Sequence, residues 1–79
     1  MQKRQIMLNG IEDAKAFVTM ANKCDFEVDV YYNRMIIDAK SILGVLSLDL
    51  SQPLTVEYTG HYAEWEEFLD AHSHVTVVA

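Results

Sequence analysis

The chain has 79 residues, of which 51% are hydrophobic and 23% are charged, and its formal net charge is −6 at pH 7. This length allows one domain with a small core and excludes a large enzyme with a deep, multi-part active site. The excess of acidic residues argues against nucleic-acid binding, which requires a concentrated positive face. We therefore expect a single domain over residues 1–79, with residues 72–79 as a loose tail.

The first half of the chain switches between strand and helix periodicity. Residues 3–8 alternate as a strand does, and Asn9 is a plausible N-cap for a helix that ends near residue 23. Residues 26–32 return to a period of two, and Asn33-Arg34 predicts a tight hairpin into a strand over residues 35–39. The residues expected on the inward face of the helix are Ile11, Ala14, Phe17, Val18 and Ala21.

The second half of the chain completes the order βαββαβα. Ser41 is expected to begin a short helix that ends near residue 50, before the turn residues 51–53. Residues 54–59 predict a fourth strand, and a last helix runs from about Tyr62 to Ala71. Each strand has a largely polar face, which indicates an α+β open-faced sandwich with the helices on one side of the sheet. The same order without the last helix is ferredoxin-like, and periodicity alone does not separate the two topologies.

Residues 38–50 form the most unusual segment, because from Ile42 to Leu48 a surface helix has almost no polar half. A short helix on a sheet buries about half of its circumference. Some of Ile42, Leu43 and Leu46 must then stay exposed beside Ser41, and contiguous exposed apolar groups mark a partner site. The alternatives are a helix that lies deep in a groove, or a patch covered by a homodimer.

A family resemblance rests on this segment. The stretch Lys40-Ser41-Ile42-Leu43-Gly44-Val45-Leu46-Ser47-Leu48 resembles the surroundings of the regulatory serine in HPr, the histidine-containing phosphocarrier protein of the bacterial sugar phosphotransferase system. The order of elements is also similar. The resemblance implies the HPr fold, a four-stranded antiparallel sheet with three helices on one face, and a phosphoacceptor or binding protein rather than an enzyme.

The position of the family's phosphohistidine differs in this chain. In the family, a Gly-x-His-Ala-Arg-Pro motif opens the first helix, and the matching stretch here begins at Gly10. Glu12 falls at the histidine position and Ala14 at the arginine position. Glu12 and Asp13 would repel a phosphate from the helix start, so we expect no phosphohistidine and no catalytic residue. An acyl phosphate on Glu12 is a weaker alternative.

Ser41 is the family feature that remains. In the resembled family this serine is the target of an HPr kinase/phosphorylase, and the modified protein docks on a catabolite-control transcription factor. A subset called catabolite-repression HPr proteins lacks the histidine and keeps the serine, and this chain is similar to that subset. The resemblance implies regulatory phosphorylation at Ser41 and partner binding through Lys40, Ile42, Leu43 and Leu46. The alternatives are a plain helix cap at Ser41, phosphate relay through a non-standard residue, and a ferredoxin-like small-molecule sensor.

The cysteine and the histidines are weaker candidates for a functional site. Cys24 is the only cysteine, and no spacing typical of a zinc site is present. His72 and His74 could ligate a metal but have no further ligands, and we expect these residues and His61 to lie away from the first helix. No apolar run is long enough to span a membrane. We expect a cytoplasmic monomer or weak homodimer without metal, cofactor or membrane partner, whose tail Val75 to Ala79 is loose, adds an edge strand or pairs with another chain.

Overall fold

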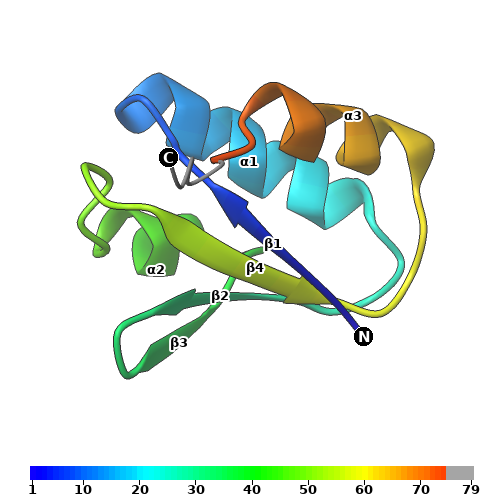
Figure 1. The fold of residues 1–79 in the computed structure, drawn as a ribbon, viewed down its shortest axis with the longest axis horizontal. Coiled ribbons are helices and arrows are strands. Elements are labelled where there is room, and N and C mark those ends of the chain that lie inside the picture. The colour runs from blue at the N-terminus through cyan, green and yellow to red at the C-terminus, as the bar shows by residue number, and fades with distance from the viewer. Residues whose placement is uncertain (75–79) are drawn as a thin grey trace, which may run out of the picture.

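The computed structural model describes residues 1–74, and the predicted tail at residues 75–79 lies outside them. Its order of elements is the predicted βαββαβα (Figure 1). No helix among residues 1–74 has the length and apolar character needed to cross a membrane. The elements are β1 (Gln2–Ile6), α1 (Ile11–Lys23), β2 (Val28–Tyr32), β3 (Met35–Asp38), α2 (Ile42–Leu46), β4 (Leu54–Tyr58) and α3 (Ala63–Ala71).

The four strands form one antiparallel sheet in the order β1-β4-β2-β3. This order confirms the predicted open-faced sandwich and excludes the ferredoxin-like arrangement, which would place β1 and β3 at the centre of the sheet. The tight hairpin is also confirmed, since Asn33 has a φ of 53° and Tyr32 pairs with Met35. Asparagine tolerates this left-handed conformation, so the chain reverses within two residues.

The core lies between the inner face of the sheet and the helices. Trp65 of α3 is fully buried, with its ring 5.5 Å from that of Phe17 on α1 and 5.9 Å from that of Tyr58 on β4. These aromatic contacts join two helices to a central strand and bury the largest side chains of the domain. The buried residues are Ile6, Leu8, Ala14, Phe17, Val18, Ala21, Cys24, Val28, Val30, Ala39, Val45, Leu48, Leu54, Val56, Tyr58, Trp65 and Leu69.

The start of α1 differs from the prediction. The helix begins after Gly10, whose φ of 89° is accessible to glycine without steric cost, so Asn9 lies outside the helix and is not its N-cap. The Asp13 carboxylate instead accepts the Asn9 N–H at 2.8 Å. Ile11 is 58% exposed rather than inward, because the buried face of α1 begins only at Ala14.

Two other elements, α2 and β2, are shorter than the sequence predicts. The helix predicted to reach residue 50 ends at Leu46, and Asp49 then accepts the Ser51 N–H at 3.0 Å in a local turn that competes with helix. Hydrogen bonds from Ser51 also lower the pKa of Asp49. β2 begins at Val28 rather than at residue 26.

Residues 72–74, which were expected to belong to a loose tail, instead pair with the edge strand β1. The Met7 N–H donates to the His72 carbonyl, and the His74 N–H donates to the Gln5 carbonyl, both at 2.9 Å. Ser73 stands opposite Ile6 in an antiparallel bridge between them. The end of α3 is therefore held beside β1, at the edge of the sheet that is farthest from β3.

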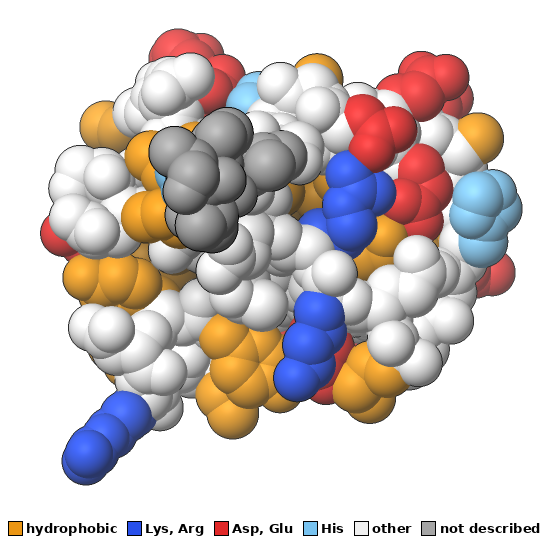
Figure 2. All heavy atoms as spheres, in the orientation of Figure 1, with side chains coloured by type: hydrophobic (Ala, Val, Ile, Leu, Met, Phe, Trp, Pro, Cys, Tyr) orange, Lys and Arg blue, Asp and Glu red, His pale blue; other side chains and the backbone are white. Residues whose placement is uncertain are grey.

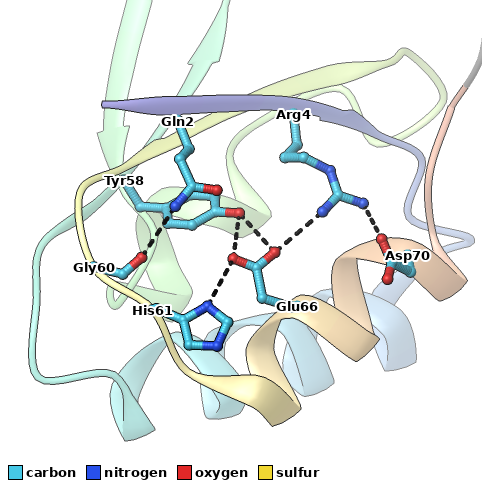
Figure 3. A network of polar contacts seen from close by, with 7 residues as sticks. All are labelled: Gln2, Arg4, Tyr58, Gly60, His61, Glu66 and Asp70. Atoms are coloured by element: carbon cyan, nitrogen blue, oxygen red, sulfur yellow. Dashed lines mark hydrogen bonds and ion pairs between the residues drawn. The ribbon is translucent and has the colours of Figure 1, made fainter.

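A polar network centred on Glu66 fastens α3 to the sheet (Figure 3). The Tyr58 hydroxyl lies 2.8 and 2.9 Å from the two Glu66 carboxylate oxygens, and Arg4 Nη1 donates to Glu66 at 3.1 Å. Arg4 also pairs with Asp70 on the next turn of α3. Burial and the adjacent Glu66 carboxylate raise the pKa of Tyr58 to about 12. The network therefore requires the neutral phenol as a donor.

Replacing Tyr58 by phenylalanine tests this network. We expect Tyr58→Phe to lower the free energy of unfolding by about 1 to 2 kcal/mol at pH 8, since a hydrogen bond to a charged group is lost. A folded-state pKa above the unfolded value gives stability that is present below pH 10 and lost as the pH rises toward 12. Urea unfolding at pH 8 and pH 11 should show a steeper loss for the parent chain than for Tyr58→Phe. Tyr31→Phe on the open sheet face is the matched control, and an equal loss in both variants would contradict the role of Tyr58.

Candidate functional site

Ser41 caps the start of α2. Its backbone is extended, with a φ of −97° and a ψ of 109°, and its side-chain oxygen accepts the Gly44 N–H at 3.2 Å. This bond satisfies one of the amide groups that a helix start leaves free. Ser41 is nevertheless exposed, so its hydroxyl is held in place at the surface.

Three apolar side chains of α2 lie beside this hydroxyl. Ile42 is 36% exposed, Leu43 is 81% exposed and Leu46 is 37% exposed. We call these three residues the α2 patch. Their exposure agrees with the sequence prediction, since α2 has only five residues and buries only Val45.

A close backbone contact sets the position of α2. A Cβ atom at Gly44 would lie 2.7 Å from Ile37 Cγ2 of β3 and 3.3 Å from the Ser41 Oγ. Only glycine allows this approach without displacing Ile37. The contact brings the start of α2 down onto β3 and turns the α2 patch away from the sheet.

Lys40 is anchored rather than free. Its Nζ donates to the Cys24 carbonyl at the end of α1 at 3.0 Å, and its N–H donates to the Asp38 carboxylate at 2.9 Å. Asn22 Nδ2 donates to the Lys40 carbonyl at 3.1 Å. Helical periodicity places Asn22 on the outward face of α1, and nothing in the sequence pattern indicates this contact. The bonds with Cys24 and Asn22 tie the residue before Ser41 to α1, and the bond with Asp38 ties it to β3.

The start of α1 carries acidic rather than basic groups. The Glu12 side chain is 90% exposed and lies 3.9 Å from Lys15 Nζ. Ala14, at the position that the resemblance assigns to an arginine, is completely buried. A longer side chain at residue 14 would therefore point into the core rather than toward residue 12.

One histidine does lie beside α1, contrary to the prediction. His72 Nε2 is 3.6 Å from the Asp13 carboxylate, and its Nδ1 is 2.9 Å from the Phe68 carbonyl. The antiparallel pairing of residues 72–74 with β1 brings the end of α3 to the start of α1. Both ring nitrogens thus face an oxygen acceptor, and the ring stacks on Phe68 with centroids 4.2 Å apart.

Metal and thiol chemistry have little support in the part of the chain that is described. Residues 1–74 contain no group of three or more histidine, cysteine or acidic side chains arranged to hold a metal. Cys24 is a buried free thiol whose pKa is raised mainly by burial. Burial of this kind favours an inert, protonated thiol.

Comparisons with known proteins identify the fold and the family. The sequence profile of PTS-HPr, described as the PTS HPr component phosphorylation site, matches residues 11–76. Among curated protein sequences, none matches this chain significantly.

Several solved structures are similar. The HPr-C-His protein of Thermoanaerobacter tengcongensis is 26% identical, with a TM-score of 0.72, covering 90% of this chain and 89% of that one. The phosphocarrier protein HPr of Bacillus anthracis is 25% identical, with a TM-score of 0.64 and 89% of each chain covered. A mycoplasma histidine-containing phosphocarrier protein shares the fold at 16% identity, with a TM-score of 0.65, covering 89% of this chain and 85% of that one.

The contact between Gly44 and Ile37 gives a test of how α2 is positioned. Gly44→Ala should lower the free energy of unfolding by about 1 to 2 kcal/mol, because overpacking against Ile37 outweighs the better helix propensity of alanine. In the background of Ile37→Ala, which removes the clashing methyl group, the same change should cost much less. Urea unfolding of the double-mutant cycle measures this coupling. Leu43→Ala is the control on the exposed side and should stay within about 0.5 kcal/mol of the parent chain.

Proposed function

Because this chain belongs to the PTS-HPr family, we propose that it is a regulatory, protein-binding member of that family controlled by phosphorylation of Ser41. The chain has Glu12 where the family's phosphohistidine would lie, and Glu12 and Asp13 together repel a further anion from the start of α1. The proposed activity is therefore to be modified and recognised rather than to pass a phosphoryl group onward.

The observation that carries the proposal is the exposure of the α2 patch next to an exposed serine. Leu43 is 81% exposed although its neighbours Val45 and Leu48 are buried in the core. An apolar cluster of this kind on a small, strongly acidic domain supports contact with another protein. Ser41 lies at its rim, so a kinase that docks on the α2 patch would find the hydroxyl within reach.

Phosphorylation would act by changing this surface rather than the fold. A phosphoryl group adds a charge of about −1.5 to −2 and strong acceptor oxygens. α2 has only five residues, so its dipole contributes little, and the phosphate oxygens can replace the Ser41 Oγ as acceptors for the Gly44 N–H. Lys40 Nζ would have to leave the Cys24 carbonyl to pair with the phosphate. An apolar patch with a new anionic rim then selects a different partner.

The partners we propose are proteins of the same regulatory system. The HPr kinase/phosphorylase would modify Ser41, and a catabolite-control transcription factor would bind the modified form through Lys40, Ile42, Leu43 and Leu46. The proposed location is the cytoplasm, where both partners act. Neither nucleic acid nor a membrane is part of this proposal.

Phosphorylation by the HPr kinase/phosphorylase tests the proposal. With ATP, we expect one phosphate per chain, which mass spectrometry should place on Ser41, and Ser41→Ala should abolish labelling. Ser47→Ala is the matched control, because Ser47 lies at the other end of the same helix and should leave labelling unchanged. Leu43→Glu should lower kcat/KM by about tenfold, since it places a charge in the docking surface without touching the core.

The outcomes separate modification from docking. Full labelling of Ser41→Ala would overturn the assignment of the site. Labelling that is normal in Leu43→Glu would overturn the docking role of the α2 patch, while circular dichroism of the variant shows that its fold is intact.

Phosphate relay through a non-standard residue is the second candidate function. The position of His72 at the start of α1 favours it. Its imidazole lies at the start of α1, 3.6 Å from the Asp13 carboxylate. Two facts weigh against it: the Nε2 atom faces a carboxylate rather than open solvent, and Arg4, the nearest arginine in sequence to α1, is paired with Glu66 and Asp70. The Arg4 guanidinium is thus already engaged and is not free to steady a phosphoryl group.

Incubation with the general phosphotransferase enzyme and phosphoenolpyruvate distinguishes the two candidates. We expect no phosphoprotein to form. Either product would be recognised if it did form, because a histidine phosphate is acid-labile and an acyl phosphate is sensitive to hydroxylamine. An acid-labile product that His72→Gln removes would establish relay. A hydroxylamine-sensitive product that Glu12→Gln removes would establish an acyl phosphate.

A further inference from the structure

β3 lies at one edge of the sheet, and this edge carries exposed apolar side chains. Among residues 1–74, in the order β1-β4-β2-β3, β3 pairs only with β2. Met35 is 46% exposed and Ile36 is 60% exposed. In Figure 2, hydrophobic side chains reach the surface along the lower edge, over β2 and β3, and a basic side chain projects at the end of this hairpin. Native edge strands are commonly protected by charges or prolines, and residues 35–37 contain neither.

Within the described residues 1–74, the backbone of β3 presents hydrogen-bonding groups along this edge that have no partner strand. Ala39, which follows β3, donates its N–H to the Val28 carbonyl of β2 at 2.9 Å. In an antiparallel pair the backbone groups of successive residues point to opposite sides, so those of residues 35, 37 and 39 point to β2. Both the N–H and the carbonyl of Ile36 therefore point away from the sheet. A second antiparallel strand can use both groups if its own Ile36 stands directly opposite.

The sequence of β3, together with the turn residue Arg34 that precedes it, is self-complementary about Ile36. If Ile36 faces Ile36 of a second copy, the same two-fold axis places Arg34 opposite Asp38 and Met35 opposite Ile37, each on both sides of the axis. Among residues 1–74, no ion pair involves Arg34, which is exposed. Cross-strand pairs of opposite charge and of apolar side chains are both stabilising.

The charges on the open face of the sheet favour this register. Cross-strand neighbours form a row of four residues, Lys3, Glu57, Asp29 and Asp38, that ends at the β3 edge. Lys3 Nζ lies 3.6 Å from the Glu57 carboxylate at one end of the row. At the other end Asp29 and Asp38 are like charges placed directly opposite, which is destabilising. Arg34 of a second copy would extend the row with a cation next to Asp38.

A hollow beside Asp38 has matching chemistry. It is lined by Glu27, Asp29, Asp38 and Lys40. The Lys40 ammonium donates to the Cys24 carbonyl at 3.0 Å, which leaves the carboxylates as the groups that a guanidinium can meet. A guanidinium forms strong, directional hydrogen bonds with carboxylates.

We infer that two copies of this chain associate through their β3 edges, in an antiparallel register centred on Ile36, with Arg34 of each copy paired with Asp38 of the other. The sheet then continues across both copies. A stable dimer buries about 1,600 Å², and one edge of a four-residue strand contributes far less, so the dimer is weak. This association does not involve Ser41 and is independent of the proposed function.

Sedimentation equilibrium of the full chain tests the inference. From about 10 µM to about 1 mM, we expect a reversible monomer–dimer equilibrium. Arg34→Asp and Asp38→Arg should each weaken self-association at least tenfold, because each places like charges opposite one another. The double variant exchanges the two charges and should restore the dissociation constant to within about threefold of the parent value.

Ile36→Pro is a second probe of the same edge. Proline removes an N–H that points away from β2, so the fold should persist while the dimer is lost. Thermal unfolding of every variant verifies the fold, and Leu43→Ala tests whether the α2 patch forms the contact instead.

A parent chain that stays monomeric at about 1 mM would overturn the inference. So would a dimer that Arg34→Asp leaves unchanged, one that the charge exchange does not restore, or one that only Leu43→Ala weakens.

Discussion

The close packing of α2 against β3 is the constraint on which the candidate surface depends. Gly44 has no side chain, so the helix backbone approaches the Ile37 side chain more closely than any other residue would allow. With α2 held there, Val45 and Leu48 fill the core, and a helix of five residues has no further turn with which to cover the α2 patch. Ser41 is fixed at the rim of this patch because it caps the same helix. The exposed hydroxyl and its apolar surroundings thus follow from one contact.

Local patterns predicted the order of elements because most strands and helices here have one apolar face and are separated by turn residues. The hairpin at Asn33 was also predictable, since few residues tolerate its positive φ. The boundaries of the helices were harder to predict from the sequence, because they depend on particular hydrogen bonds. α1 begins after Gly10 and not at Asn9, and α2 ends early because Asp49 and Ser51 form their own turn. Periodicity has no information about such competing local bonds.

Contacts between distant segments lay beyond the sequence pattern. His72 and Asp13 are 59 positions apart and meet only because the chain after α3 pairs with β1. Glu66 accepts hydrogen bonds from both Tyr58 and Arg4, which lie far from it in the sequence or on another element. Lys40 was expected to bind a partner, and its ammonium instead donates to the Cys24 carbonyl at the end of α1. For the site, the pattern predicted which side chains are exposed, whereas the chemistry proposed for Ser41 comes from the resemblance.

The pairing of residues 72–74 with β1 also fixes the position of His74 in the fold. His74 lies at the β1 edge, on the far side of the sheet from β3. A fluorescent reporter attached at His74 would therefore leave the β3 edge accessible. In a pair of copies joined through β3, the two His74 residues would be separated by nine strand spacings, roughly 43 Å at about 4.8 Å per spacing. Energy transfer between two such reporters is efficient over that separation, so the association could be followed inside living cells.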